Sequence, residues 1–99
     1  MKDYSTSILL GNGEVITKHY NTKNQLHREE GPAVETAYQR EWWVDGKQHR
    51  VNGPAVMIER NDYIRMEWWV NGVLHRDNNK PAVIDSDGNI EYWVNGEKK

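Results

Sequence analysis

A chain of 99 residues is long enough for one domain with a modest core. Its formal net charge of -2 comes from 13 basic and 15 acidic side chains, so it lacks the basic excess typical of nucleic-acid-binding domains. The sequence contains no cysteine, which excludes disulfides and thiolate metal sites, and no apolar run of membrane-spanning length.

The segment 8–25 opens the chain as a degenerate repeat. The stretch GNGEVITKHYNTKNQ (11–25) carries only His19-Tyr20 where the later units have an aromatic pair. The apolar run before it, Ile-Leu-Leu at 8–10, is too short for a secretory signal, so a cytoplasmic location is expected.

Three clearer units follow at 26–47, 48–73 and 74–99, within a single domain spanning 1–99. One phrase recurs as LHREEGPAV (26–34), QHRVNGPAV (48–56) and LHRDNNKPAV (74–83). The other recurs as EWWVDGK (41–47), EWWVNGV (67–73) and EYWVNGE (91–97). The chain therefore holds about three and a half copies of one unit, too few for a repeat array without caps or a partner.

Each unit has the pattern of paired strands. The Asp45-Gly46, Asn71-Gly72 and Asn95-Gly96 pairs predict two-residue turns with positive φ at both positions. The segment 33–41 alone could also form a helix, but its counterparts 55–67 and 82–91 could not, so all three read as strand–turn–strand. The expected fold is all-β, an antiparallel meander of about six to eight short strands in a single-layer or curled sheet.

A two-residue turn at Asp45-Gly46 sets the register of the hairpin around it. It places Trp42 opposite His49 on one face, and Glu41 opposite Arg50 on the other face with Trp43. The face that carries the first tryptophan, Val44 and the histidine is the more apolar, and it is the candidate core.

Features copied into every unit are expected to build the unit. A histidine that stands once per repeat suits packing and hydrogen bonding better than a proton relay or a metal site, and the Glu–Arg pairs suit register pairing across strands. The residues assigned to this structural role are His27, His49, His75, Glu41, Arg50, Glu67 and Arg76.

Function is sought where the units differ. The segments 38–40 and 59–65 are rich in tyrosine and arginine, residue types enriched in protein interfaces. The predicted partner-binding residues are Tyr38, Arg40, Arg60, Tyr63 and Arg65, with Trp43, Trp69 and Trp93 behind them as an aromatic stripe. The bland alternative is that the two segments are tolerated surface turns.

The sequence offers little support for an enzymatic function or a metal site. The sequence has no phosphate-binding loop, no nucleophile motif and no HExxH motif, so no catalytic residue, metal or cofactor is predicted and the protein is not expected to be an enzyme. The segment DSDGNIE (85–91) is too short and has too few carboxylates for a calcium loop, which favours a hairpin turn.

The alternation of HR(E/D)…GPAV with EWWVNG resembles the MORN-like repeats of antitoxin-type proteins, and the HREDGPA…WYxNGK repeats of phage and giant-virus proteins, over residues 11–97. The segment DNNKP (77–81) departs from the usual pattern by one added residue. The resemblance implies single-layer β-hairpin sheets that bind other molecules and implies no catalytic residues.

The resulting hypothesis is a protein-binding module of a phage or mobile element that blocks a host enzyme or toxin by occlusion, in the host cytoplasm and without a membrane. Two alternatives stay open. One is a structural protein that self-assembles through edge strands. The other is a binder of a small ligand or a single-stranded nucleic acid that stacks on the tryptophans.

Overall fold

The computed structural model describes residues 2–99, which form fourteen β-strands joined by turns and loops and contain no helix. Eight strands make one antiparallel sheet and six make three two-stranded ribbons. The sheet strands, in spatial order, are β1 (Tyr4–Leu9), β2 (Val15–Tyr20), β3 (Val34–Glu35), β4 (Gln39–Glu41), β7 (Val56–Arg60), β8 (Tyr63–Glu67), β11 (Val83–Asp85) and β12 (Ile90–Glu91). The ribbon strands are β5 (Trp43–Val44) with β6 (Lys47–Gln48), β9 (Trp69–Val70) with β10 (Val73–Leu74), and β13 (Trp93–Val94) with β14 (Glu97–Lys98).

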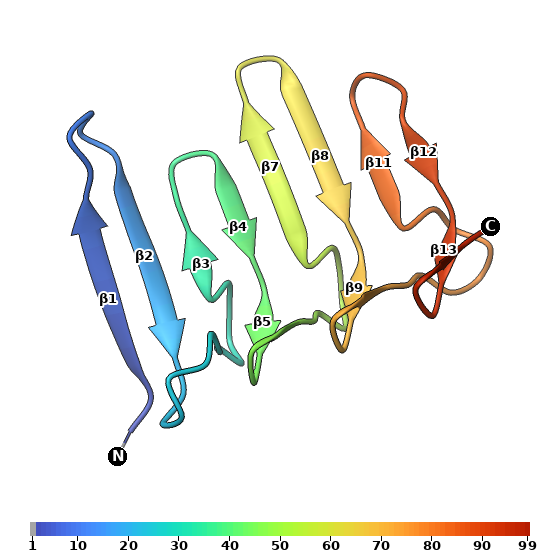
Figure 1. Cartoon of the computed structure of the whole chain (residues 1–99). Coiled ribbons are helices and arrows are strands. Elements are labelled where there is room, and N and C mark those ends of the chain that lie inside the picture. Colours follow the sequence, from blue (N-terminus) through green and yellow to red (C-terminus); the bar gives the residue numbers. More distant parts are fainter. Residues whose placement is uncertain (1) are drawn as a thin grey trace.

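The all-β meander is confirmed, and the three segments predicted as strand–turn–strand form β3–β4, β7–β8 and β11–β12. The predicted six to eight strands match the sheet alone, since each full unit adds a ribbon. The sheet is open, because its order runs from β1 to β12 without pairing between these two strands (Figure 1).

The chain passes from sheet to ribbon at a single residue in each unit. Trp42 donates its N–H to the carbonyl of Ala55 in the sheet, and its own carbonyl accepts the N–H of His49 in the ribbon. Trp68 repeats this with Ala82 and His75. A residue with hydrogen-bond partners in two sheets bends the strand. The residues before it therefore belong to the large sheet, and the residues after it form a separate two-stranded ribbon.

The ribbon turns have the predicted conformation. Asp45 and Gly46 have φ of 48° and 78°, and the Asn71-Gly72 and Asn95-Gly96 turns follow the same pattern. Positive φ at both central residues matches the right-handed twist of short hairpins, and Asn, Asp and Gly tolerate it.

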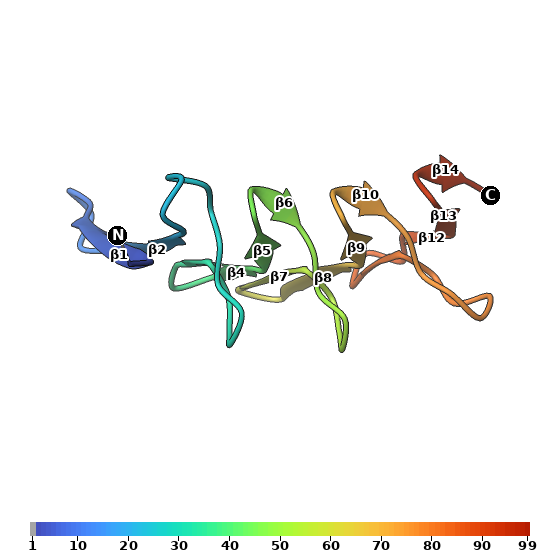
Figure 2. The ribbon, with the colours of Figure 1, turned by 90° about the horizontal axis from the view of Figure 1, so that it is seen from below.

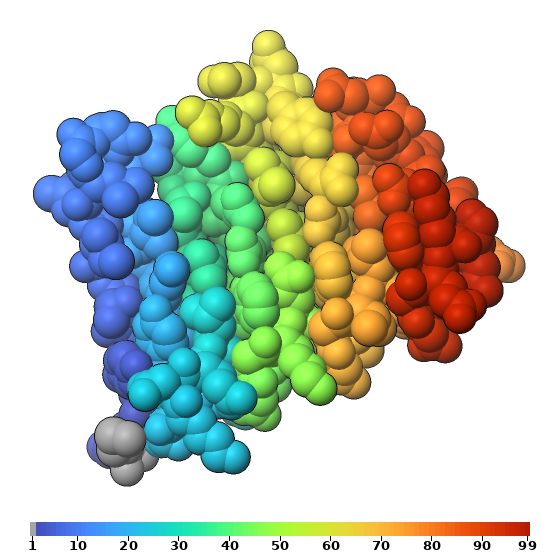
Figure 3. Space-filling model, viewed as in Figure 1, coloured from blue at the N-terminus to red at the C-terminus, as the bar shows by residue number. Residues whose placement is uncertain are grey.

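The molecule is one layer with two different sides. Its principal extents are 40 × 33 × 18 Å. Figure 2 shows the ribbons rising from one side of the sheet and the loops that contain the Gly-Pro segments projecting from the other. We call these the ribbon side and the loop side. Neighbouring hairpins touch along their lengths (Figure 3), so the units form one continuous surface.

The predicted core was wrong. Trp42, Val44 and His49 are only half-buried, because a one-layer sheet cannot cover a large ring on all sides. The buried apolar side chains belong instead to the Ala-Val of each Pro-Ala-Val segment: Ala33, Val34, Ala55, Val56, Ala82 and Val83. The three alanines have no exposed surface, where sheet strands and loops meet.

The first unit differs from its predicted boundary and from the others. Its hairpin begins at Tyr4, which pairs with Tyr20, and the two rings stack at 5.0 Å. In place of a ribbon, the chain makes a turn at 21–25, which the side chain of Asn21 stabilises by accepting the N–H groups of Lys23 and Gln25.

Candidate interaction surface

Each of the three repeat histidines bonds the ribbon turn that comes next along the chain. His27, His49 and His75 each accept, at Nδ1, the first N–H of the next ribbon turn, at 2.9, 3.0 and 2.9 Å. The donors are Asp45, Asn71 and Asn95, in that order. An accepting Nδ1 places the ring proton on Nε2. The structure therefore gives these histidines a structural role, in which each one holds the start of the next ribbon turn.

The repeat arginines lie over the first tryptophan of each pair. The guanidinium of Arg50 is 3.8 Å from the ring centre of Trp42, and Arg76 lies at the same distance from Trp68. Arg50 also donates Nη1–H to the Pro54 carbonyl at 3.1 Å. Burial lowers the pKa of Arg50 below its usual value.

The predicted Glu41–Arg50 and Glu67–Arg76 pairs were therefore wrong. Glu41 lies in the large sheet between Val34 and Val56, whereas the N–H of Arg50 bonds the carbonyl of Trp69 in the next ribbon. The bend between sheet and ribbon separates residues that a straight hairpin would place face to face.

The glutamates hold the second tryptophans instead. The Nε1–H groups of Trp43, Trp69 and Trp93 each donate at 2.8 Å to the carboxylate two residues before them on the same strand side. All three indoles are half-buried on the ribbon side. The row that was expected as an aromatic stripe thus has its polar atoms engaged and part of each ring covered.

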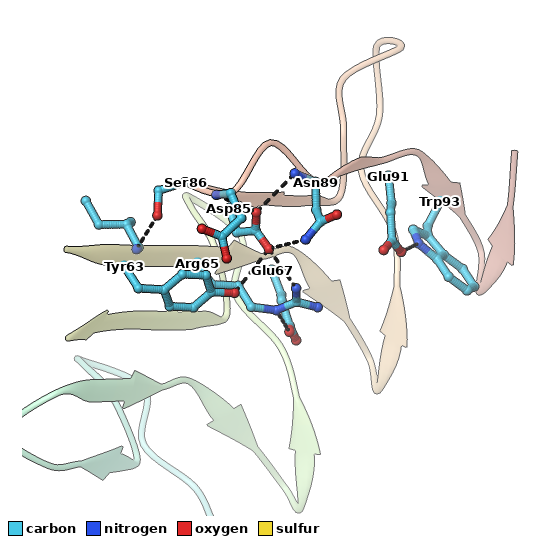
Figure 4. Close-up of polar contacts among 10 residues, drawn as sticks. Tyr63, Arg65, Glu67, Asp85, Ser86, Asn89, Glu91 and Trp93 are labelled. Atoms are coloured by element: carbon cyan, nitrogen blue, oxygen red, sulfur yellow. Dashed lines mark hydrogen bonds and ion pairs between the residues drawn. The ribbon is translucent and has the colours of Figure 1, made fainter. Parts of the chain in front are cut away.

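The predicted interface residues of 59–65 divide between two places. Tyr63 donates its hydroxyl to Asp85 at 3.1 Å, and Arg65 bonds Glu67 at 2.7 Å and Asp85 at 3.5 Å. Figure 4 shows these side chains converging on β11. Arg60 points elsewhere, with its guanidinium 4.7 Å from the ring centre of Tyr38 at the tips of neighbouring hairpins.

Asp85 organises the turn of segment 85–91, whose sequence was weighed above against a calcium loop. Its carboxylate accepts the side-chain amide of Asn89 at 2.7 Å and the N–H groups of Asp87 and Asn89 at 3.0 Å (Figure 4). These hydrogen bonds, with the Asn89 side chain the largest contributor, lower the pKa of Asp85. The segment is a hairpin turn, as predicted. Within residues 2–99, no group of three carboxylate, imidazole or thiol side chains is placed to hold a metal ion.

The remaining predicted residue, Arg40, pairs with Glu35 across β3–β4 at 3.2 Å. The five Tyr and Arg residues therefore form no single patch. Tyr38 with Arg60 is one exposed cluster, Tyr63 with Arg65 is tied to the sheet, and Arg40 faces the loop side.

Sequence reasoning missed an apolar row on the loop side. The strand registers place Met57 beside Met66, Met66 beside Ile84, and Ile84 beside Ile90. Ile64 stands two residues from Met66 on the same side of β8. Ile64 and Ile90 are 46% and 57% exposed. The alternation of side chains along each strand already indicated which residues share a side. Only the pairing of β8 with β11 shows that the apolar residues of the two hairpins form one row.

Grooves run between the projecting loops of the loop side. The largest, about 500 Å³, lies between the loops at 28–31 and 50–52 and is floored by Trp42 and Arg50. An equivalent groove of about 340 Å³ lies between the loops of the next two units, floored by Trp68 and Arg76. The loop side thus repeats one surface relief from unit to unit.

Comparison with known proteins finds no matching family, no matching curated protein and no matching solved structure. Residues 2–99 contain no helix, and therefore none that is long and apolar enough to cross a membrane.

Proposed function

We propose that this chain is a protein-binding repeat module. The observation that carries the proposal is the uncovered loop side of a one-layer sheet, where Ile90 of the apolar row and Ile64 beside it are about half exposed. A sheet normally buries its apolar face against a second layer. A contiguous exposed apolar surface on a folded domain is typical of an interaction site.

A non-enzymatic role is supported by the way the polar side chains are used. The histidines accept hydrogen bonds from the next ribbon turn, the arginines lie on tryptophans, and the glutamates hold indoles. Among the described residues, every buried side-chain nitrogen or oxygen has a hydrogen-bond partner. Groups engaged in this way build the scaffold and leave binding to the surface.

The resemblance of the units to MORN-like repeats supports the same proposal. In its finer form, the partner is a host enzyme or toxin, and the module blocks it by covering its active surface on behalf of a phage or mobile element. Occlusion needs only a rigid, complementary surface, which a continuous sheet can supply without catalytic groups.

Affinity capture from bacterial lysates tests the proposal. The immobilised chain is compared with two variants, Tyr38→Ala with Arg60→Ala at the hairpin tips and Ile64→Glu with Ile90→Glu on the loop side. All these side chains are exposed, so the variants should keep their melting temperatures. We expect the chain to retain a protein that one of the two variants loses.

The alternatives give different results in the same experiments. Retention of oligonucleotides with quenching of tryptophan fluorescence would favour a nucleic-acid binder. A mass that rises with concentration in light scattering, with no captured protein, would favour self-assembly through edge strands. Either outcome would contradict the proposed function.

A further inference from the structure

The loop-side row is formed by Met57, Met66, Ile84 and Ile90 and crosses β7, β8, β11 and β12 at right angles to the strands. Strands lie about 4.8 Å apart, so the row is about 14 Å long. The same register continues on the other side of β7 with polar residues, beginning with Arg40. The row therefore ends at β7, and polar residues separate it from the exposed Leu9 and Val15 at the far end of the same side.

Two guanidiniums border this row at the end of the sheet where the loops project. Arg50 lies 4.0 Å from the sulfur of Met57 through Nη1. Arg76 occupies the equivalent place in the next unit, where Ile84 takes the position of Met57.

Neither of these arginines forms an ion pair with a carboxylate within residues 2–99, in contrast to Arg40 and Arg65. The loop after Arg50 continues with Val51 and Asn52, and Val51 is 82% exposed. The border of the row is thus positively charged at two points, with an exposed apolar side chain between them. A partner that supplies carboxylates there would form the ion pairs that these two guanidiniums lack within residues 2–99.

The dimensions favour a helix as the occupant. The two arginines are separated by two strand intervals, or about 10 Å, which matches the rise of about 10.5 Å between residues i and i+7 of an α-helix. A row about 14 Å long corresponds to about ten helical residues, enough for three or four apolar side chains on one face.

A second copy of the chain fits less well. A stable symmetric interface buries about 800 Å² on each partner, more than four aligned side chains provide. Two copies meeting through this side would also bring like-charged arginines and the projecting loops against each other.

We propose that the loop side of β7, β8, β11 and β12 docks an amphipathic helix of the partner protein, with apolar side chains on the row and carboxylates against Arg50 and Arg76. This inference rests on the proposed protein-binding function and names the chemistry of the partner. The apolar contacts provide the affinity, and the two carboxylates set the direction and register of the helix.

The test uses two synthetic helical peptides of about 15 residues with the same leucine face. One carries glutamates along the edge of that face and the other carries lysines at the same positions. Binding to the full chain is measured by isothermal titration calorimetry. We expect the acidic peptide to bind at least about tenfold more tightly than the basic one, and its affinity to fall as NaCl rises from about 0.05 to 0.5 M.

Two variants locate the binding. Ile64→Glu with Ile90→Glu places charges on and beside the row and should weaken the acidic peptide at least about tenfold. Ile8→Glu with Leu9→Glu is the matched control, because these exposed apolar residues of β1 lie at the other end of the sheet, and its affinity should stay within about twofold. Circular dichroism confirms that both variants are folded.

Three results would overturn the inference: no binding of either peptide, equal binding of both, or equal loss in the two variants. Capture of a protein that is retained by Ile64→Glu with Ile90→Glu would also overturn it. That last result would leave the proposed protein-binding function standing, so the two failures are distinguishable.

Discussion

Replacement of Glu67 by Gln removes the negative charge that two neighbouring side chains share. One carboxylate oxygen accepts the indole N–H of Trp69 at 2.8 Å, and the other accepts Nε–H of Arg65 at 2.7 Å. A glutamine can still accept from the indole but turns its amide N–H groups toward the guanidinium. The loss is one hydrogen bond between charged groups, worth about 1.5–3 kcal/mol when fully buried. Since the Arg65 side chain is 28% exposed, we expect about 1 kcal/mol.

The free energy of unfolding is measured by urea titration with circular dichroism, and a loss of about 1 kcal/mol corresponds to a fall of about 4–8 °C in Tm for a domain of this size. Glu91→Gln is the matched control, because among the described residues its side chain accepts only the indole N–H of Trp93, and it should cost less than half as much.

A double-mutant cycle then separates the two candidate partners of Glu67. Combined with Arg65→Gln, the Glu67→Gln change should show a coupling energy of about 1 kcal/mol, whereas with Arg76→Gln the two effects should add to within about 0.5 kcal/mol. A larger coupling with Arg76 than with Arg65 would refute the structural pairing and restore the register expected of a straight hairpin.

Three further outcomes are expected. Val83→Ala should lower the free energy of unfolding by about 2–3 kcal/mol, measured by urea titration, because Val83 is 1% exposed and the substitution leaves a cavity. Hydrogen bonds led by the Asn89 side chain lower the pKa of Asp85, so its stabilising contribution is present above about pH 4–5 and is lost as the pH falls through that lowered pKa. Asp85→Asn should therefore flatten the acid limb of stability against pH, and an unchanged limb would contradict the assignment. His75→Ala should lower the free energy of unfolding by about 1 kcal/mol and speed hydrogen exchange at the Asn95 amide, which loses its acceptor. Unchanged exchange at that amide would argue against the hydrogen bond from Asn95 to His75.

The hairpins themselves are local features, and the sequence was sufficient to predict them. Asp45-Gly46 and its counterparts adopt positive φ at both positions because few other residue pairs tolerate it. The comparison of three units also corrected a local ambiguity, since the segment 33–41 alone has helical character and its counterparts do not. Repetition along the chain thus supplied what a single segment lacked.

The partners of the charged side chains could not be predicted in the same way. The register counted from the turn holds for Trp43 with Gln48, but it fails two residues farther on, where Glu41 belongs to a different sheet. The bend depends on the hydrogen bond from Trp42 to Ala55, a contact with the next unit. No pattern within one hairpin specifies that contact.

The sequence by itself determined the repeated hairpins, the turn conformations and the all-β class, because these depend on residues close together in the chain. Only the tertiary structure decided which side chains are buried and which meet. It assigned the core to small alanines and valines where units pack closely, and it aligned Met66 with Ile84 from separate hairpins into one partly exposed row. Burial and cross-hairpin register depend on how the units stack, which is a property of the whole sheet.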